Sequence, residues 1–214
     1  MSERELSWFE RMALRFMASQ ERRAYGYETP FMAEIVRTHG LGGMFGVSLA
    51  ITRVVKAVDK AFGTEQANLL LGALGLWNGC SWCSVGHFRA ANLLRFARTG
   101  EPYALDERLV PAWMALDFDQ LEDQLAEILG EDSDEARLIR AAAAVQEDRE
   151  TDFPHRDLLK RAVHAWALVN DCSVTLTYDL DPAVVPALLP KNAVEQDARD
   201  RYTALRPLEE AMGD

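Results

Sequence analysis

Two cysteines and a histidine, Cys80, Cys83 and His87, form the most chemically specific pattern in the chain. They follow the turn Asn78-Gly79 and should open a helix, where unpaired backbone amides favour negative charge and lower the pKa of a thiol. Cys80 and Cys83 are three residues apart, so on a helix they can cycle between dithiol and disulfide with little backbone movement. His87 lies one turn beyond Cys83, where it can take the thiol proton and hold the thiolate as an ion pair. The pattern predicts thiol redox chemistry, with Cys83 as the more acidic thiol.

Two other interpretations of the cysteine pair stay open at this point. Free cysteine is often a small core residue, so the pair could be two structural thiols. A zinc site could take Cys80, Cys83 and His87 as ligands, but the sequence offers no second C-x-x-C or H-x-x-x-H to close it. We therefore expect neither a metal nor another cofactor.

The remaining cysteine and histidines carry weaker signals. Cys172 stands at an apolar helical position and is predicted to be a core residue, so a disulfide should join Cys80 to Cys83 and leave Cys172 out. His39, His155 and His164 are expected to be ordinary surface or helix-end residues. Of the three, His39 is the strongest candidate for a catalytic role, because it precedes a glycine-rich turn.

The elements that must position these residues are helices. Apolar residues recur with a helical period along nearly the whole chain, and the alternation typical of strands is almost absent. The sequence predicts one compact all-α domain over residues 1–214, built around a helical hairpin that carries the cysteines. The expected helices cover residues 3–19, 31–38, 44–62, 64–77, 80–98, 106–116, 119–129, 133–147, 155–178 and 194–212.

A weak internal similarity links residues 74–80, LGLWNGC, with residues 166–172, WALVNDC. Where the first copy continues with Cys83 and His87, the second has Thr175 and Asp179. A degenerate duplicated hairpin stays open as an explanation, in which only the first copy kept its thiol chemistry.

Composition narrows the partners and the compartment. The chain has 214 residues, with 23 Lys and Arg against 34 Asp and Glu, which gives a formal charge of −11. This charge repels phosphate backbones and anionic lipids, so neither nucleic acid nor a membrane is an expected partner. We expect no run of apolar residues long enough to cross a bilayer, no secretory signal and no lipidation motif. Three cysteines in such a chain suit the reducing cytoplasm.

The segment from Asn78-Gly79-Cys80 through Cys83 to His87 resembles the N-G-C-x-x-C-x-x-x-H signature of alkyl hydroperoxidase D-like proteins in the carboxymuconolactone decarboxylase superfamily. The core likeness covers residues 64–98, and a looser one to the peroxidase-related branch extends to residues 36–39 and 167–170. The resemblance implies an all-helical homo-oligomer that reduces small-molecule peroxides or disulfides and is re-reduced by a thiol donor. By position it makes Cys83 the nucleophile, Cys80 the resolving thiol and His87 part of a proton relay.

One residue departs from that family pattern. Peroxidase members carry a Glu twelve residues before the first cysteine, where this chain has Asn68, and Glu65 one turn earlier could replace it. Trp82 also stands where some relatives have a His between the cysteines. Because Asn cannot accept and return a proton, we expect weak peroxidase activity beside competent dithiol–disulfide exchange. The rival functions are a lactone lyase or isomerase of the decarboxylase type and a non-enzymatic helical oligomer.

Overall fold

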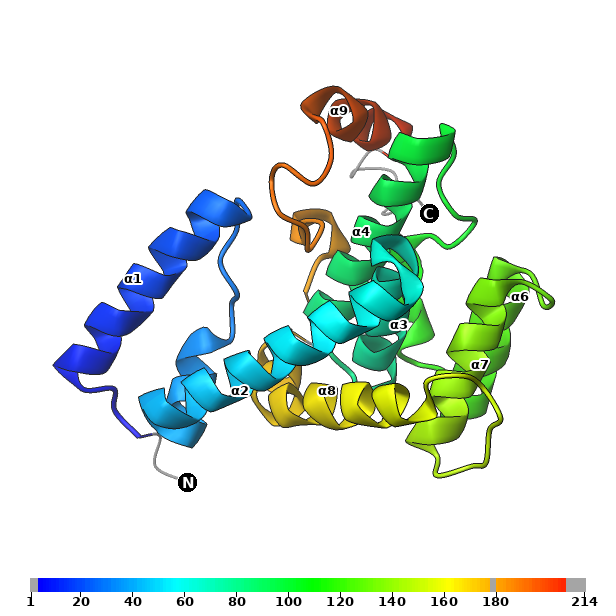
Figure 1. Ribbon diagram of the computed structural model, residues 1–214. Coiled ribbons are helices and arrows are strands. Elements are labelled where there is room, and N and C mark those ends of the chain that lie inside the picture. Colours follow the sequence, from blue (N-terminus) through cyan, green and yellow to red (C-terminus); the bar gives the residue numbers. More distant parts are fainter. Residues whose placement is uncertain (1–3, 178–179, 207–214) are drawn as a thin grey trace.

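The computed structural model describes residues 4–177 and 180–206, and within these ranges the chain is all-α, as predicted (Figure 1). No strand occurs in the described ranges. In chain order the elements are α1 (Trp8–Ala24), α2 (Met32–Phe62), α3 (Thr64–Trp77), α4 (Ser81–Thr99), η1 (Glu107–Leu109), α5 (Val110–Trp113), α6 (Phe118–Leu129), α7 (Asp134–Gln146), α8 (Arg156–Thr177), η2 (Pro182–Val184) and α9 (Gln196–Leu205).

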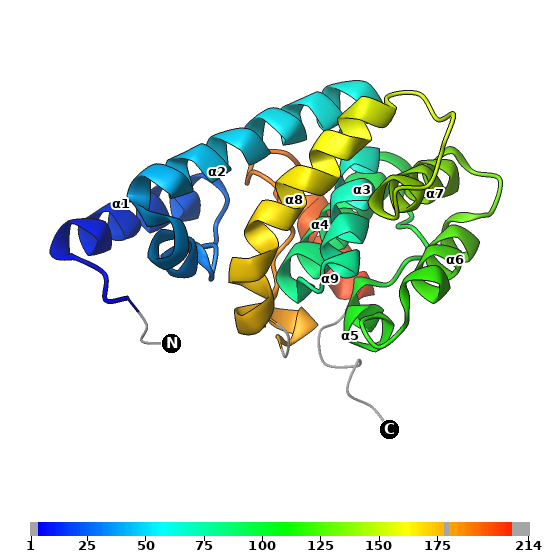
Figure 2. The same ribbon diagram turned by 90° about the horizontal axis from the view of Figure 1, so that it is seen from below.

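The hairpin of α3 and α4 forms the centre of the molecule, with α2, α7, α8 and α9 packed around it (Figures 1 and 2). Every residue of α3 from Ala67 to Leu76 is buried. Two glycines let the helices approach closely, since a Cβ at Gly72 would lie 2.5 Å from the Phe88 ring and one at Gly75 would lie 2.9 Å from the Cys83 Cβ. The cysteine-bearing start of α4 is therefore held tightly against α3.

The expectation of two helices, over residues 31–38 and 44–62, is confirmed in their separation, although the gap between them is narrower than expected. Helix α2 (Met32–Phe62) consists of two helical segments that meet at a kink at Gly40, whose φ of 68° and ψ of 173° are not helical. Glycine adopts this positive φ readily, so the helical backbone is interrupted at this residue. Phe62 at its end contacts His155, just before the start of α8, with ring centroids 5.6 Å apart, so the two helices pack side by side in opposite directions.

By length and composition α2 is long and apolar enough to cross a membrane, with a mean hydropathy of 1.5 over its best window. The sequence-based expectation that no such segment exists is corrected on this point. A single helix of this kind is weak evidence for a membrane, and only 11% of the apolar window is buried in this fold. In this fold α2 packs against α3 and α8.

Some helices begin or end at other residues than predicted, because capping hydrogen bonds set their ends. α1 begins at Trp8 because the Ser7 hydroxyl accepts a hydrogen bond from the Glu10 amide at 3.2 Å, while the Glu10 carboxylate accepts one from the Ser7 amide at 2.8 Å. The expected ends at residues 3, 178 and 212 lie outside the described residues. The predicted helix over 106–116 is divided into η1 and α5.

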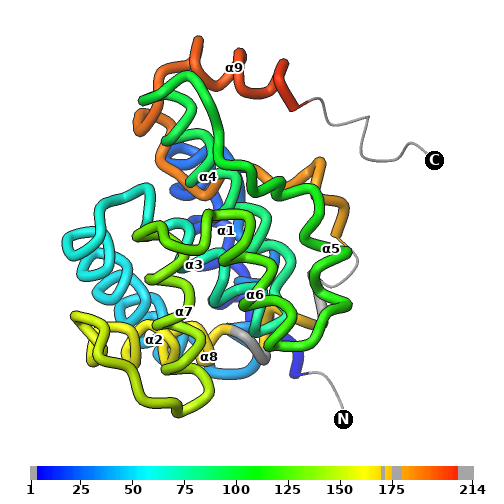
Figure 3. The backbone as a smooth tube through the Cα atoms, turned by 90° about the vertical axis from the view of Figure 1, so that its right-hand side faces the viewer, coloured from blue at the N-terminus to red at the C-terminus, as the bar shows by residue number. Residues whose placement is uncertain are grey.

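The segment after α8 returns across α4 before it forms α9 (Figure 3). The Leu188 amide donates a hydrogen bond to the Gly86 carbonyl at 2.9 Å, and the Leu188 side chain lies over Gly86, where a Cβ would come within 2.4 Å of it. The return segment thus brings Leu188 next to the helical turn that carries Cys83 and His87.

Candidate thiol site

The structure brings Cys80 and Cys83 together at the start of α4, as predicted. Cys80 is the N-cap residue of the helix, and its sulfur accepts a hydrogen bond from the Cys83 amide at 3.3 Å. Both residues are buried, and both are thiols in this structure. The Cys80 sulfur therefore lies over the first turn of α4, which holds Cys83.

The expected lowering of the Cys83 pKa is contradicted by this geometry. The hydrogen bond with the Cys80 side chain, together with burial, raises the pKa of Cys83 well above its usual value. The Cys83 amide donates to the Cys80 sulfur, and the lowering that the same amide exerts on the Cys83 pKa is smaller than these raising effects. Sequence spacing alone could not show which of the two thiols takes the amide, and burial opposes the charged form of Cys83.

His87 is held by Asn68, the residue that departs from the family pattern. Its Nδ1 lies 2.8 Å from Oδ1 of Asn68, across the hairpin. The Asn68 amide nitrogen donates to the Thr64 carbonyl at 2.8 Å, so its oxygen is the atom that faces His87. An amide oxygen only accepts hydrogen bonds, which assigns the proton to Nδ1 and leaves Nε2 of His87 as the basic nitrogen.

The imidazole is neutral near pH 7, because burial lowers the pKa of His87 to about 3. The Trp166 ring lies against it, with centroids 5.6 Å apart. The expected thiolate–imidazolium ion pair is therefore not the resting state of the site. With a raised thiol pKa and a lowered imidazole pKa, the proton stays on Cys83, and His87 is an unprotonated but weak base.

Cys83 and His87 line the same cavity, which has a volume of about 430 Å³. Its wall is mainly apolar and aromatic and includes Trp82, Trp166 and Leu188. Tyr27, from the loop between α1 and α2, also lines it and packs edge-on against Trp82, with ring centroids 6.0 Å apart. Among the described residues that line the cavity Cys83 is present and Cys80 is not, so a small molecule in the cavity meets Cys83 first.

Glu65 does not line the cavity that contains Cys83 and His87. Its carboxylate accepts hydrogen bonds from the Arg98 guanidinium at 3.0 and 3.1 Å and from the Tyr103 hydroxyl at 2.6 Å. Glu65 is one turn before Asn68 in α3, but it takes part in these contacts and does not line the cavity. The expectation that it replaces the family Glu near His87 is corrected by this placement.

Cys172 is a core residue, 1% exposed, as predicted. Its sulfur lies 3.9 Å from Nε2 of His39, the histidine that precedes the bend at Gly40. His155 packs on Phe62, and His164 lies on α8. Thr175 and Asp179, the second-copy counterparts of Cys83 and His87, lie outside the residues whose side chains are described.

Sequence reasoning missed the residues that complete the cavity, because Tyr27, Trp166 and Leu188 are far from the cysteines in the chain. The sequence marks Asn68 as a departure from the family pattern but gives no sign of its hydrogen bond to His87. No cluster of three or more Cys, His, Asp or Glu side chains suited to a metal ion occurs in the described ranges. No family model, curated protein or solved structure matches this chain. The resemblance to alkyl hydroperoxidase D-like proteins therefore rests on its motif alone.

Proposed function

We propose that this chain is a thiol-dependent oxidoreductase that reduces small organic hydroperoxides or disulfides. In this proposal Cys83 attacks the substrate, Cys80 resolves the product and His87 accepts and returns the proton. The observation that carries it is the placement of Cys83 and His87 on one cavity, with the Cys80 sulfur 3.3 Å from the Cys83 amide on the protein side.

With a hydroperoxide, the Cys83 thiol would give its proton to Nε2 of His87 as the sulfur attacks the terminal oxygen. The O–O bond breaks, the alcohol leaves with the proton from His87, and Cys83 becomes a sulfenic acid. The Cys80 thiol then attacks the Cys83 sulfur, water leaves, and a disulfide joins the two cysteines. An external dithiol restores both thiols and is itself oxidised to a disulfide.

With a disulfide substrate, the Cys83 sulfur would attack one substrate sulfur and release the other as a thiol. Cys80 then attacks the Cys83 sulfur of the mixed disulfide and releases the second thiol. This route asks less of the proton relay, because a thiolate of low pKa leaves without full protonation. Since Asn68 orients His87 but cannot carry a proton, we propose that disulfide exchange is the stronger activity and peroxidase activity the weaker.

Turnover assays test the proposal and separate it from its rivals. Reduced protein is mixed with cumene hydroperoxide or with an aromatic disulfide, in the presence of dithiothreitol as the donor. We expect both activities to be lost in Cys83→Ser and to persist in Cys172→Ser, a matched control at a buried cysteine outside the cavity. A lactone lyase would not need either cysteine of the pair, and a non-enzymatic oligomer would show no turnover at all.

The proposed partners are the small-molecule substrate, a thiol reductant and further copies of this chain, and the proposed compartment is the cytoplasm. Self-association is supported by α1, which stands apart from the body in Figure 1 and exposes three aromatic side chains. Trp8 is 69% exposed, Phe9 67% and Phe16 65%. Apolar surface of this kind marks interaction sites in soluble proteins. Light scattering should give a mass above that of the 24.0 kDa chain, and a monomer would oppose this part of the proposal.

A further inference from the structure

A second cavity, of about 480 Å³, lies between α2 and α8 and shares no lining residue with the cysteine cavity. On α2 it is bordered by Ala50, Arg53, Val54 and Ala57, which recur at helical spacing along one face. Ile51 and Val55, on a neighbouring face of the same helix, line the cysteine cavity. The two cavities are therefore separate sites on one pair of helices, and we call the second one the α2–α8 groove.

The charge of the α2–α8 groove is opposite to that of the protein as a whole. All the titratable side chains described in its lining are basic: Arg53, Lys160, Arg161 and His164. The four are exposed, and none of them forms an ion pair with any residue in the described ranges. Elsewhere in this chain of net charge −11, most arginines are paired with carboxylates, as Arg140 is with Glu131 and Arg149 with Glu122. Three cations, Arg53, Lys160 and Arg161, without an ion-pair partner around one groove indicate an anionic occupant.

The floor of the groove is apolar. Val54, Leu158, Ala165 and Leu168 line it, and from residue 50 to residue 57 it runs for about 10 Å along α2. An inorganic anion would satisfy the cations and leave this floor in water. A ligand with an apolar body and an anionic head would bury the floor and pair with the cations, as small-molecule sites commonly do.

We propose that the α2–α8 groove binds an acyl carboxylate, with the carboxylate among Arg53, Lys160 and Arg161 and the acyl chain over Val54, Ala165 and Leu168. Guanidinium groups suit this head because their fork geometry matches the two carboxylate oxygens. The site is independent of the thiol chemistry proposed above, and its failure would leave that proposal unchanged.

Isothermal titration calorimetry with sodium decanoate tests the site directly. We expect saturable one-to-one binding, weakened about tenfold or more in the double variant Arg53→Gln/Arg161→Gln, because two exposed ion pairs are lost. Leu168→Glu, at a partly exposed floor position, should weaken it as well by placing a like charge beside the ligand. Decanol and inorganic phosphate, which each keep one half of the ligand chemistry, should bind much more weakly than decanoate.

The matched control is Lys56→Gln, which removes a cation from α2 that lines the cysteine cavity and not the groove. Its affinity for decanoate should equal that of the wild type. Loss of binding in Lys56→Gln with no change in the double variant would place decanoate in the cysteine cavity and overturn the proposal. It would also be overturned by phosphate binding as tightly as decanoate. A third result would also overturn it: decanoate does not bind, and the double variant has a smaller mass than the wild type in light scattering. The groove would then be a contact between copies of the chain.

Discussion

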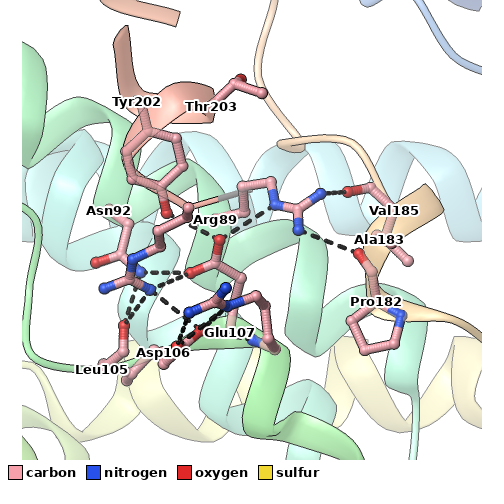
Figure 4. Close-up of polar contacts among 12 residues, drawn as sticks. Arg89, Asn92, Leu105, Asp106, Glu107, Pro182, Ala183, Val185, Tyr202 and Thr203 are labelled. Carbon is pink, nitrogen blue, oxygen red and sulfur yellow. Dashed lines mark hydrogen bonds and ion pairs between the residues drawn. The ribbon is translucent and has the colours of Figure 1, made fainter. Parts of the chain in front are cut away.

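Helix α4 carries two buried polar clusters that differ in almost every physical respect. At its start, Cys83 and His87 are neutral, and His87 has one side-chain hydrogen bond, to Asn68. Farther along, Arg89 and Asn92 join a charged network around Glu107, which is 1% exposed (Figure 4).

Every acceptor position of the Glu107 carboxylate in this network is used. One oxygen accepts from Arg89 Nε at 3.2 Å and from the Tyr202 hydroxyl at 2.8 Å. The other accepts from Asn92 Nδ2 at 2.8 Å and from the Arg206 guanidinium at 2.7 Å. A buried charge that is fully satisfied in this way specifies structure and has no capacity left for a substrate.

The comparison teaches which polar group is available for chemistry. The Glu107 network joins distant segments, since Arg89 also donates to the carbonyls of Pro182 and Val185 and so fastens the return segment that carries Leu188. In the cysteine cluster, His87 bonds Asn68 across the α3–α4 hairpin, and Cys83 and His87 face a cavity. The first should control stability and the second reactivity, and the following variants test that division.

The largest expected effect is on stability, from Glu107→Ala. Removing the carboxylate leaves the mostly buried guanidinium of Arg89 without an acidic partner and that of Arg206 with Asp106 alone, which costs about 3–5 kcal/mol in the free energy of unfolding. Urea denaturation measures it, with the exposed Glu101→Ala as the control. A loss below about 1 kcal/mol would mean that the network contributes little to stability.

The next effect concerns peroxidase rate and Asn68. Asn68→Glu places a group that can carry a proton beside His87 and should raise cumene hydroperoxide turnover, by up to about 10². Glu65→Gln should leave peroxidase activity unchanged, because that carboxylate is engaged with Arg98 and Tyr103. If Glu65→Gln abolishes the activity instead, Glu65 serves the relay from outside the cavity and our placement of the relay is wrong.

Thiol reactivity should show the raised pKa of Cys83. In a Cys172→Ser background we expect iodoacetamide to modify Cys83 at pH 7 at least about tenfold more slowly than the same thiol in urea, because one pKa unit removes about nine-tenths of the thiolate. Replacing His87 by Gln should change this rate little, since a neutral imidazole holds no ion pair. Faster modification of the folded protein would restore the ion pair that the sequence predicted.

The smallest effect is the acid sensitivity contributed by His87. Its pKa is about 3 in the folded chain and about 6.5 in an unfolded one, so below pH 6.5 the unfolded chain binds a proton that the folded chain does not. Stability should therefore fall as the pH drops from about 6.5 toward 3, by less than about 1.4 kcal/mol per pH unit because His87 is partly accessible to solvent. His87→Gln should reduce this slope, whereas His164→Gln at an exposed site should not.

The sequence predicted the all-α class and the cysteine pair because both depend on local spacing. A C-x-x-C-x-x-x-H run on a helix places its members on one face whatever surrounds them. The Asn68 contact to His87 and the Glu107 network depend on residues 15 to 99 positions apart, and the burial that raises the pKa of Cys83 depends on the packing of the whole fold. Each of these contacts is made by single residues that follow no sequence spacing, so only the three-dimensional structure shows them.

The central claim is that Cys80 and Cys83 form a reversible disulfide with each other. Peptide mapping by mass spectrometry, before and after one equivalent of hydrogen peroxide and again after dithiothreitol, tests it most directly. The account predicts a single new link between the peptides that contain Cys80 and Cys83, fully reversed by dithiothreitol, with Cys172 still alkylatable after denaturation. A link from either cysteine to Cys172, or no disulfide after oxidation, would contradict it.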